Sequence, residues 1–341
     1  MPSTPQSIID DRRSSQRKAA LACGQNDIWN ASQSQESPPW GTARGFAYPL
    51  GSRDPEFFVK FTGSWGKEVL ESEQRNHMFA FNTLCGLQQP ASQQLKLLVC
   101  VPEIFRVFEY RERYFMVMEF VPGSTLHELA STRQDAGAGA GAGGQADNSA
   151  LCRYIAEGIR LLCVKAPPGA KPGPVGGGLV RHHFFRYNQS AVPYRDVKML
   201  ETHLNKVLEF VYKGVKPDGD RPLPIVLDKE LEFYYSDLSC GNFIFTSAGG
   251  HTVLYIIDFD EAGFLPSSFM TFVLNNPPTA SRTANSRVTQ DIHHLFELDK
   301  RDEVAILKVA EMMSTSSNRV GFPLAGYPET EYKKRQRIDE Q

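Results

Sequence analysis

Hydrophobic and polar residues recur along the chain with two different periods, and these periods predict strands and helices. Residues 46–61 contain two short apolar runs around a turn rich in Gly, Asp and Pro, which is typical of a β-hairpin. Apolar residues spaced three and four apart predict a helix over 67–85, with Glu73 the one acidic member of that face. Two further strands are predicted at 102–107 and 114–121.

The second half of the chain is predicted to be mainly helical. A short helix is expected near 126–130, and longer ones at 151–163, 197–211 and 303–313; Asp196 is expected to cap the helix 197–211. Two strand-like runs, 243–246 and 253–257, flank a Ser-Ala-Gly-Gly turn. Strands first and helices later predict an α+β protein with a small N-terminal lobe and a larger helical lobe, and a cleft between such lobes commonly binds a ligand.

Shifts in composition suggest four segments, one of which contains an insertion. Weak apolar periodicity predicts a poorly ordered or peripheral N-terminal segment over 1–38, followed by an N-lobe over 39–121 that holds a sheet and one helix. The C-lobe is expected over 122–315, after a Pro-Gly break. It contains an Ala/Gly repeat at 136–144 that cannot pack a core and predicts a flexible insertion. Residues 316–341 are expected to form a C-terminal tail.

Composition narrows the functional class. The 341 residues are 41% hydrophobic and 22% charged, which is typical of a globular protein and excludes a fibre or wholesale disorder. A formal net charge of −2 argues against general nucleic-acid binding. We expect no membrane partner, because no apolar run approaches the ~20 residues that a spanning helix needs. With no secretory signal pattern, we expect a cytosolic or nuclear protein. We also expect a monomer. The six cysteines form no C-x-x-C pair and are expected to be buried thiols.

Three polar residues near the second predicted hairpin are candidates for catalysis. Asp237 and Asn242 lie five residues apart in a polar loop, and Asp258 ends the apolar run VLYII sixteen residues after Asn242. Carboxylate and amide oxygens are the ligands that Mg²⁺ prefers, and it shares its coordination shell with phosphates. Asp237 would then orient an attacking hydroxyl and accept its proton.

These residues resemble the motifs of the aminoglycoside phosphotransferase and choline kinase-like family, which has the protein-kinase-like fold. The family's catalytic loop reads H-G-D-x-x-x-x-N, and this chain has YSDLSCGN at 235–242. The family's metal strand reads I-I-D-[FW]-x-x-A-G, and this chain has IIDFDEAG at 256–263. The strand FVKF at 58–61 and the segment MEFVPG at 118–123 resemble the family's lysine strand and its interlobe hinge. The layout is most similar to divergent fungal members and covers roughly residues 40–275.

The resemblance implies an ATP- and Mg²⁺-dependent phosphotransferase that acts on a hydroxyl of a small molecule. Lys60 would bind the α- and β-phosphates, and Glu73 would pair with Lys60. The backbone of the hinge, at Glu119 and Val121, would meet the adenine. Two metal ligands, Asn242 and Asp258, and the catalytic Asp237 complete the implied site.

Departures from the family pattern keep two alternatives open. Tyr235 and Ser236 replace the loop His and Gly. Tyr235 and the lack of a clear glycine loop favour a pseudokinase, that is, a nucleotide-binding or structural module with little or no transfer activity. A protein kinase is the other alternative, although no activation segment ending in A-P-E follows Asp258. The run Gly41–Gly45 fits either a glycine loop over the phosphates or a plain turn.

Overall fold

The computed structural model describes residues 4–36, 43–87, 96–136, 144–213, 222–275, 285–296 and 301–321. It is an α+β protein whose N-terminal part contains an antiparallel sheet. The chain divides into two compact units, each made of several stretches of sequence. Unit 1 comprises 1–163, 237–260 and 277–296, and unit 2 comprises 164–236, 261–276 and 297–341.

The first sheet of unit 1 has the strand order β1-β2-β5-β4 and is antiparallel throughout. Its strands confirm the predicted hairpin and the two strands that follow it. They are β1 (Arg44–Tyr48), β2 (Phe57–Gly63), β4 (Ile104–Tyr110) and β5 (Arg113–Met118). The predicted strand 114–121 therefore ends three residues early, at Met118.

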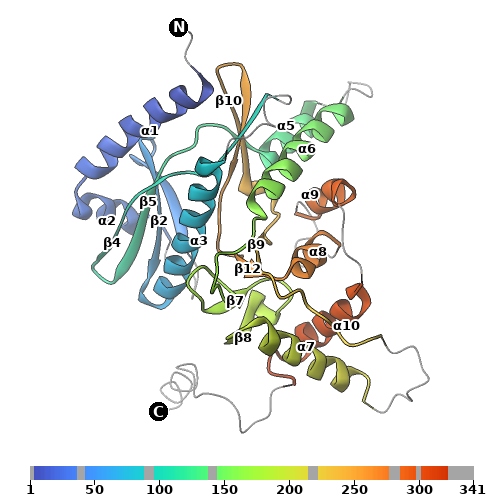
Figure 1. Ribbon diagram of the computed structural model, residues 1–341. Helices are drawn as coiled ribbons and strands as arrows, with labels where there is room; N and C mark the ends of the chain where they lie inside the picture. The colour runs from blue at the N-terminus through green and yellow to red at the C-terminus, as the bar shows by residue number, and fades with distance from the viewer. Residues whose placement is uncertain are drawn as a thin grey trace. The chain divides into compact units, whose positions relative to one another are not determined.

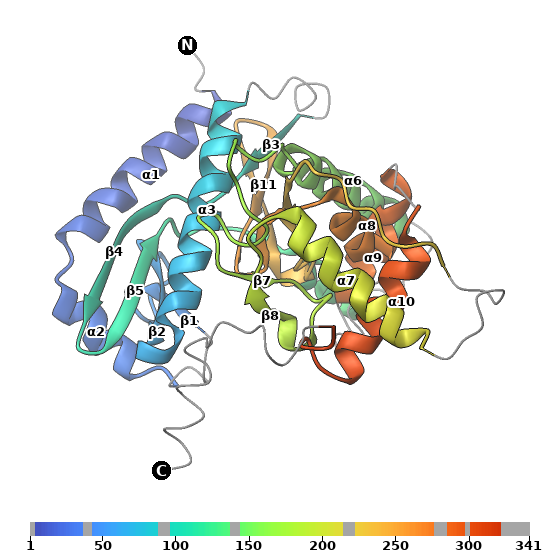
Figure 2. The same ribbon diagram turned by 60° about the horizontal axis from the view of Figure 1, so that its bottom comes forward.

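Helices cover both faces of this sheet (Figures 1 and 2). On one face, α1 (Pro5–Ala22) and α2 (Gln25–Gln33) bring Ala20 and Ile28 against the alternate residues Phe57, Val59 and Phe61 of β2. On the other face, α3 (Lys67–Gly86) brings Leu70 against Phe58, Tyr114 and the methionines of β5. Because side chains of a strand alternate between faces, Lys60 shares the α3 face with Phe58.

The second sheet of unit 1 has the order β3-β11-β10-β6 and joins distant parts of the sequence. The hairpin β10 (Phe243–Ala248) and β11 (His251–Ile256) was predicted, and it pairs in parallel with β3 (Leu97–Cys100) and antiparallel with β6 (Ser124–Thr125). Helix α6 (Gly144–Leu162) packs against β11, α3 and α9. The remaining helices of unit 1 are α5 (Leu126–Ala136) and α9 (Asn285–Ile292).

The described part of unit 2 contains two small antiparallel sheets of two strands each, β7-β8 and β9-β12, and three α-helices around a core rich in aromatic residues. Helix α7 is capped by Asp196, whose side chain accepts a hydrogen bond from the Met199 N–H, as predicted. It packs against α10, and α10 also contacts α8 (Figure 2). The elements of unit 2 are β7 (Leu179–Arg181), β8 (Gln189–Pro193), α7 (Val197–Val211), β9 (Glu232–Tyr235), β12 (Ala262–Leu265), α8 (Ser267–Asn275) and α10 (Glu303–Thr315).

The N-terminal segment, predicted to be poorly ordered or peripheral, forms α1 and α2 over residues 5–33. The buried positions of α1 are Ile9, Arg13, Gln16 and Ala20, which lie on one face of the helix. Two of these four residues are polar, so the face shows no apolar periodicity in the sequence. The helix nevertheless packs, because Arg13 and Gln16 find buried hydrogen-bond partners.

The predicted boundary at 121/122 does not separate the two units. Residues 237–260, which carry the candidate loop and Asp258, belong to unit 1 because β10 and β11 pair with β3 and β6. The Ala/Gly insertion at 136–144 and the tail at 316–341 lie largely outside the described residues.

None of the helices among the described residues is long and apolar enough to cross a membrane. None of the six cysteines forms a disulfide. Their predicted burial holds for Cys100, Cys152 and Cys240, whereas Cys85, at the end of α3, is exposed.

Candidate functional site

Lys60 lies in the middle of β2 and bonds to two carboxylates. Its Nζ donates to Glu73 Oε1 at 2.6 Å and to Asp258 Oδ1 at 2.8 Å. The three side chains are 17%, 3% and 39% exposed, respectively. Asp258 is 198 residues away from Lys60 in the sequence, so only the tertiary structure joins them. The structure thus brings three predicted site residues into one cluster.

Glu73 reaches this cluster because the face of α3 that carries it packs on the sheet. The buried positions Leu70, Glu73, His77, Ala80 and Leu84 of α3 recur every three or four residues. Glu73 is 2% exposed, so it is a buried carboxylate rather than a solvated one. Buried carboxylates are rare unless they are paired, and the partner here is Lys60.

Burial and charge shift the pKa values of this pair. Burial raises the pKa of Glu73 above its ordinary value, a shift that the charge of Lys60 opposes and the charges of Asp258 and Asp260 reinforce. Burial lowers the pKa of Lys60, but the charges of Asp258 and Glu73 outweigh it, and the net shift is upward. Lys60 therefore stays protonated at neutral pH and provides a fixed positive charge at the site.

Asp258 occupies a backbone conformation that suits few residues. It follows β11 with a φ of 62°, in the left-handed region that Asn and Asp tolerate better than most residues. The next residue, Phe259, is fully buried, and its carbonyl accepts a hydrogen bond from Asn76 of α3 at 3.1 Å. The ring of Phe259 also packs edge-on against His77. These contacts with α3 hold the segment around Asp258 next to the helix that carries Glu73.

The loop with Asp237 and Asn242 is held by its own hydrogen bonds. Asn242 Nδ2 donates to the Asp237 carbonyl at 3.1 Å, and the Ser239 N–H donates to Asp237 Oδ1 at 3.2 Å. The Asn242 carbonyl accepts from the Ile257 N–H at 3.1 Å, which ties the loop to the residue before Asp258. The amide oxygen of Asn242 accepts no hydrogen bond from any described residue, and the side chain is 8% exposed.

The pKa of Asp237 is raised, mainly by burial and next by the negative charge of Asp258. Hydrogen bonds from Asn242 and the Ser239 N–H act in the opposite direction. Asp237 thus lies within electrostatic range of Asp258. The site combines four acidic side chains that influence one another, Glu73, Asp237, Asp258 and Asp260, with the single lysine of the Lys60 cluster.

This surplus of negative charge would suit a cation. Across the described ranges, no group of three or more His, Cys, Asp or Glu side chains is arranged to hold a metal ion by itself. An ion bound by Asn242 and Asp258 would therefore need further ligands from water or phosphate, which is how Mg²⁺ is usually bound.

The side chain of Glu119 has a role that the sequence did not indicate. Its carboxylate is fully buried, pairs with Arg12 at 2.8 Å and Arg13 at 2.7 Å, and accepts from the Tyr255 hydroxyl at 2.8 Å. The guanidinium of Arg13 also donates to the Val101 carbonyl. The sequence shows Arg12 and Arg13 at consecutive positions, but no pattern in it identifies Glu119 as their partner.

Only some of the backbone N–H and carbonyl groups of the predicted hinge form hydrogen bonds within the described structure. The Glu119 N–H donates to the Glu103 carbonyl at 2.8 Å. In the part of the chain that the structure describes, the Glu119 carbonyl and the N–H and carbonyl of Val121 form no hydrogen bond. Gly123, which follows, must be glycine, because a Cβ there would lie 2.5 Å from the Phe245 carbonyl oxygen of β10.

The possible glycine loop is only partly described. Gly45 lies in β1, directly opposite Lys60 in the β1–β2 register. A Cβ on Gly45 would lie 2.4 Å from the ring of Phe58, so side-chain packing accounts for this glycine. Gly41 lies outside the described residues.

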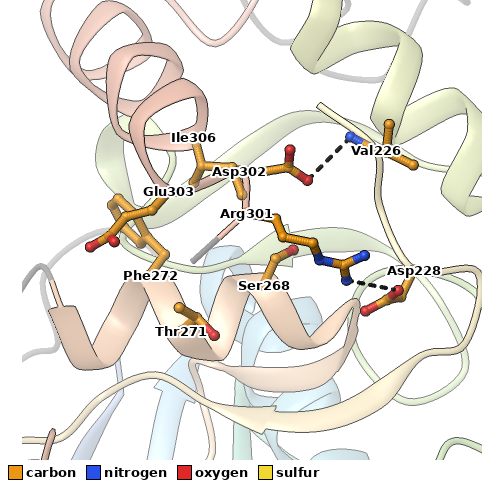
Figure 3. Close-up of a pocket in the computed structure, with 9 residues that line it drawn as sticks. All are labelled: Val226, Asp228, Ser268, Thr271, Phe272, Arg301, Asp302, Glu303 and Ile306. Atoms are coloured by element: carbon orange, nitrogen blue, oxygen red, sulfur yellow. Dashed lines mark hydrogen bonds and ion pairs between the residues drawn. The ribbon is translucent and has the colours of Figure 1, made fainter. Parts of the chain in front are cut away.

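Two hollows of different size lie among the described residues of unit 2. The smaller, of about 20 Å³, lies between α8, α10 and the segment 226–228, and Figure 3 shows Arg301 paired with Asp228 in it. That volume holds about one water molecule, which is too small for a substrate. The larger hollow, of about 800 Å³, is bordered by residues 165–170 and the first turn of α7. Its charged groups are partly compensated by the pairs Lys165–Glu230 and Lys198–Glu201.

Comparisons with known proteins add little to this geometry. No protein-family model matches the chain, and no curated protein matches it either. Among solved structures, the chain is similar to one described as "Structure of the microcompartment-associated aminopropanol kinase". The two share 14% sequence identity with a TM-score of 0.34, over 91% of this chain and 93% of the other. The function has to be inferred from the Lys60 cluster and its surroundings.

Proposed function

We propose that this protein is an ATP- and Mg²⁺-dependent phosphotransferase that transfers a phosphoryl group to a hydroxyl of a small molecule. We further propose that it has the two-lobed protein-kinase-like fold and resembles the aminoglycoside phosphotransferases. The observation that carries the proposal is the double ion pair of Lys60. A strand lysine joins a carboxylate of the packed helix, Glu73, to Asp258, which follows the second hairpin. That is the combination expected where phosphates and a metal ion are held together.

The residues present fit Mg²⁺ and a nucleotide. Asn242 has a free amide oxygen within the described structure, Asp258 is the most exposed member of the Lys60 cluster, and both offer the hard oxygen ligands that Mg²⁺ takes. When bound, Mg²⁺ would neutralise phosphate charge. Lys60 would bind the α- and β-phosphates, and Glu73 would hold its ammonium in place. The adenine would meet the unoccupied backbone groups of Glu119 and Val121.

Asp237 is the residue we propose as catalytic. It would orient the acceptor hydroxyl and take its proton, and its raised pKa makes it a better proton acceptor than an ordinary aspartate. Hydrogen bonds from Ser239 and Asn242 fix the loop that carries it. In such sites positioning and charge stabilisation supply most of the catalysis, so few residues are needed.

The test is thermal unfolding with and without Mg²⁺ and ATP, for the wild type and Asp258→Asn. Asn is nearly the same size and tolerates the left-handed backbone of Asp258, so this variant removes the charge without adding the strain expected of Ala. ATP at about one hundred times its dissociation constant should stabilise the wild type by ~2.7 kcal/mol. The shift should need Mg²⁺, vanish in Asp258→Asn, and persist in the control Asp54→Asn on an exposed turn. No shift in the wild type would refute the proposal.

The pseudokinase remains the second candidate, and one structural observation favours it. Tyr235, which stands where the family has His, is fully buried and pairs with Ala262 in the two-stranded β9-β12 sheet. Ser236, in place of Gly, bonds the Glu261 carbonyl through its N–H and its hydroxyl, both at 3.0 Å. Through these contacts, Tyr235 and Ser236 contribute to the packing of unit 2. Metal-dependent ATP turnover that Asp237→Asn abolishes would support the enzyme, and nucleotide binding without turnover across a panel of hydroxylated acceptors would support the pseudokinase.

A further inference from the structure

A side chain of α1 binds the backbone just beyond β5. Gln16 Nε2 donates to the Phe120 carbonyl at 3.0 Å, and Gln16 Oε1 accepts from the Phe120 N–H at 3.0 Å. Gln16 is 8% exposed. Its primary amide makes the same pair of hydrogen bonds that a neighbouring strand makes with one residue of a ladder. At this position α1 therefore takes the place of an edge strand.

The contact decides which backbone groups remain available. In an extended segment, successive residues point their N–H and carbonyl groups to opposite edges. If this alternation continues past β5, Phe120 turned toward α1 leaves Glu119 and Val121 turned the other way, where the Glu119 N–H donates to the Glu103 carbonyl at 2.8 Å. Within the described structure, the Glu119 carbonyl and both backbone groups of Val121 make no hydrogen bond, although Val121 is only 9% exposed. Buried backbone groups are rarely left unpaired, so this edge suits a ligand with adjacent donors and acceptors.

The same helix also restrains the side chain of Glu119. Arg13 Nε lies 2.7 Å from Glu119 Oε2, and Arg12 lies 2.8 Å from Oε1. The hydroxyl of Tyr255, on β11, donates to the same carboxylate. Residues 119 and 120 are thus held from one side by α1 at two successive positions, and binding at the opposite edge needs little further ordering.

We propose that Gln16 is a positioning residue for the base of the nucleotide. The inference rests on the proposed function and adds to it a role for α1. Gln16 does not touch the ligand. It fixes Phe120 so that Glu119 and Val121 present a carbonyl, an N–H and a second carbonyl to a purine edge. In the β2–β5 register, Lys60 lies opposite Met116. Met116 precedes Glu119 by three residues and Val121 by five, which is roughly 10–17 Å along an extended chain. The phosphates and the base therefore depend on different residues.

The variant Gln16→Met tests this, because it keeps the length of the side chain and removes both hydrogen bonds. The matched control is Gln6→Met, since Gln6 is exposed on the same helix and bonds only to Asp10. Isothermal titration calorimetry would measure the dissociation constants of Mg-ATP and of Mg-tripolyphosphate, which lacks the base. We expect Gln16→Met to weaken ATP binding about tenfold, the equivalent of about 1.4 kcal/mol, with tripolyphosphate affinity unchanged. Gln6→Met should match the wild type for both ligands.

Two results would overturn the inference. Unchanged ATP affinity in Gln16→Met would show that the contact does not position the base. An equal loss for both ligands would show a general structural role. If Gln16→Met does not fold, Gln16→Glu retains the oxygen that accepts from Phe120 and should show a smaller, base-specific loss. A wild type that binds neither ligand would instead refute the proposed function itself, so the two failures are distinguishable.

Discussion

Removing Lys60 should destabilise unit 1 through the carboxylate that is left behind. In Lys60→Met, Glu73 keeps its position on α3 at 3% exposure but loses its ammonium partner. Breaking a buried ion pair by removing one partner costs ~3–5 kcal/mol. Asp258 contributes little to that cost, because at 39% exposure water can solvate it. Glu73 can also take up a proton in this variant, since burial raises its pKa and the opposing charge of Lys60 is gone. We therefore expect the lower end of the range, about 3 kcal/mol.

A double-mutant cycle with Glu73→Gln isolates this effect. The single variant Glu73→Gln leaves Lys60 paired with Asp258 and should cost about 1 kcal/mol. In the double variant no buried carboxylate is left without a partner. The loss of unfolding free energy should therefore be about 2 kcal/mol, whereas the two single variants sum to about 4 kcal/mol, so the coupling energy is about 2 kcal/mol.

The assay is urea unfolding followed by tryptophan fluorescence. All three tryptophans, Trp29, Trp40 and Trp65, belong to the part of the sequence assigned to unit 1, so their emission reports on that unit. The control is Lys67→Met, which removes an exposed lysine at the start of α3 and should leave the midpoint unchanged. The reasoning would be refuted if Lys60→Met unfolded at the same midpoint as Lys67→Met, or if the two single effects were additive.

Two further predictions concern the stability of unit 1. His77 is fully buried and its pKa is lowered from 6.5 to about 4, chiefly by burial, so the folded protein binds fewer protons than the unfolded chain in that window. Stability should fall as pH drops from 6.5 toward 4, by up to about 1.4 kcal/mol per pH unit. His77→Gln should flatten this slope in fluorescence-monitored unfolding, and an unchanged slope would contradict the assignment. In the β4–β5 turn, Arg111 and Glu112 both have positive φ, at 45° and 64°, as a two-residue type I′ turn requires. Glu112→Gly should therefore raise the unfolding free energy by about 0.5–1 kcal/mol, and a lower urea midpoint would count against it.

Much of the local structure followed from the sequence alone. Helix α3, the hairpin β10–β11 and the Asp196 cap all lie where periodicity and capping residues predicted them. Such features depend on contacts within a few residues, which a sequence pattern records directly. The order Lys60, Glu73, Asp237, Asn242 and Asp258 was also visible in the sequence, together with the chemistry that their side chains allow.

The tertiary structure alone decided which of these residues meet. The ion pair between Lys60 and Asp258 spans 198 residues, and it forms because β11 lies in the second sheet of unit 1 and α3 contacts both β2 and Phe259. Helix α1 was missed because its buried face carries Arg13 and Gln16, whose partners, Glu119 and Phe120, lie more than 100 residues further along the chain. A polar residue is buried only where a distant group satisfies its hydrogen bonds, and no local pattern contains that partner. The sequence by itself therefore determined the chemistry available to this protein, while the long-range packing determined which groups are placed together and which backbone groups remain open.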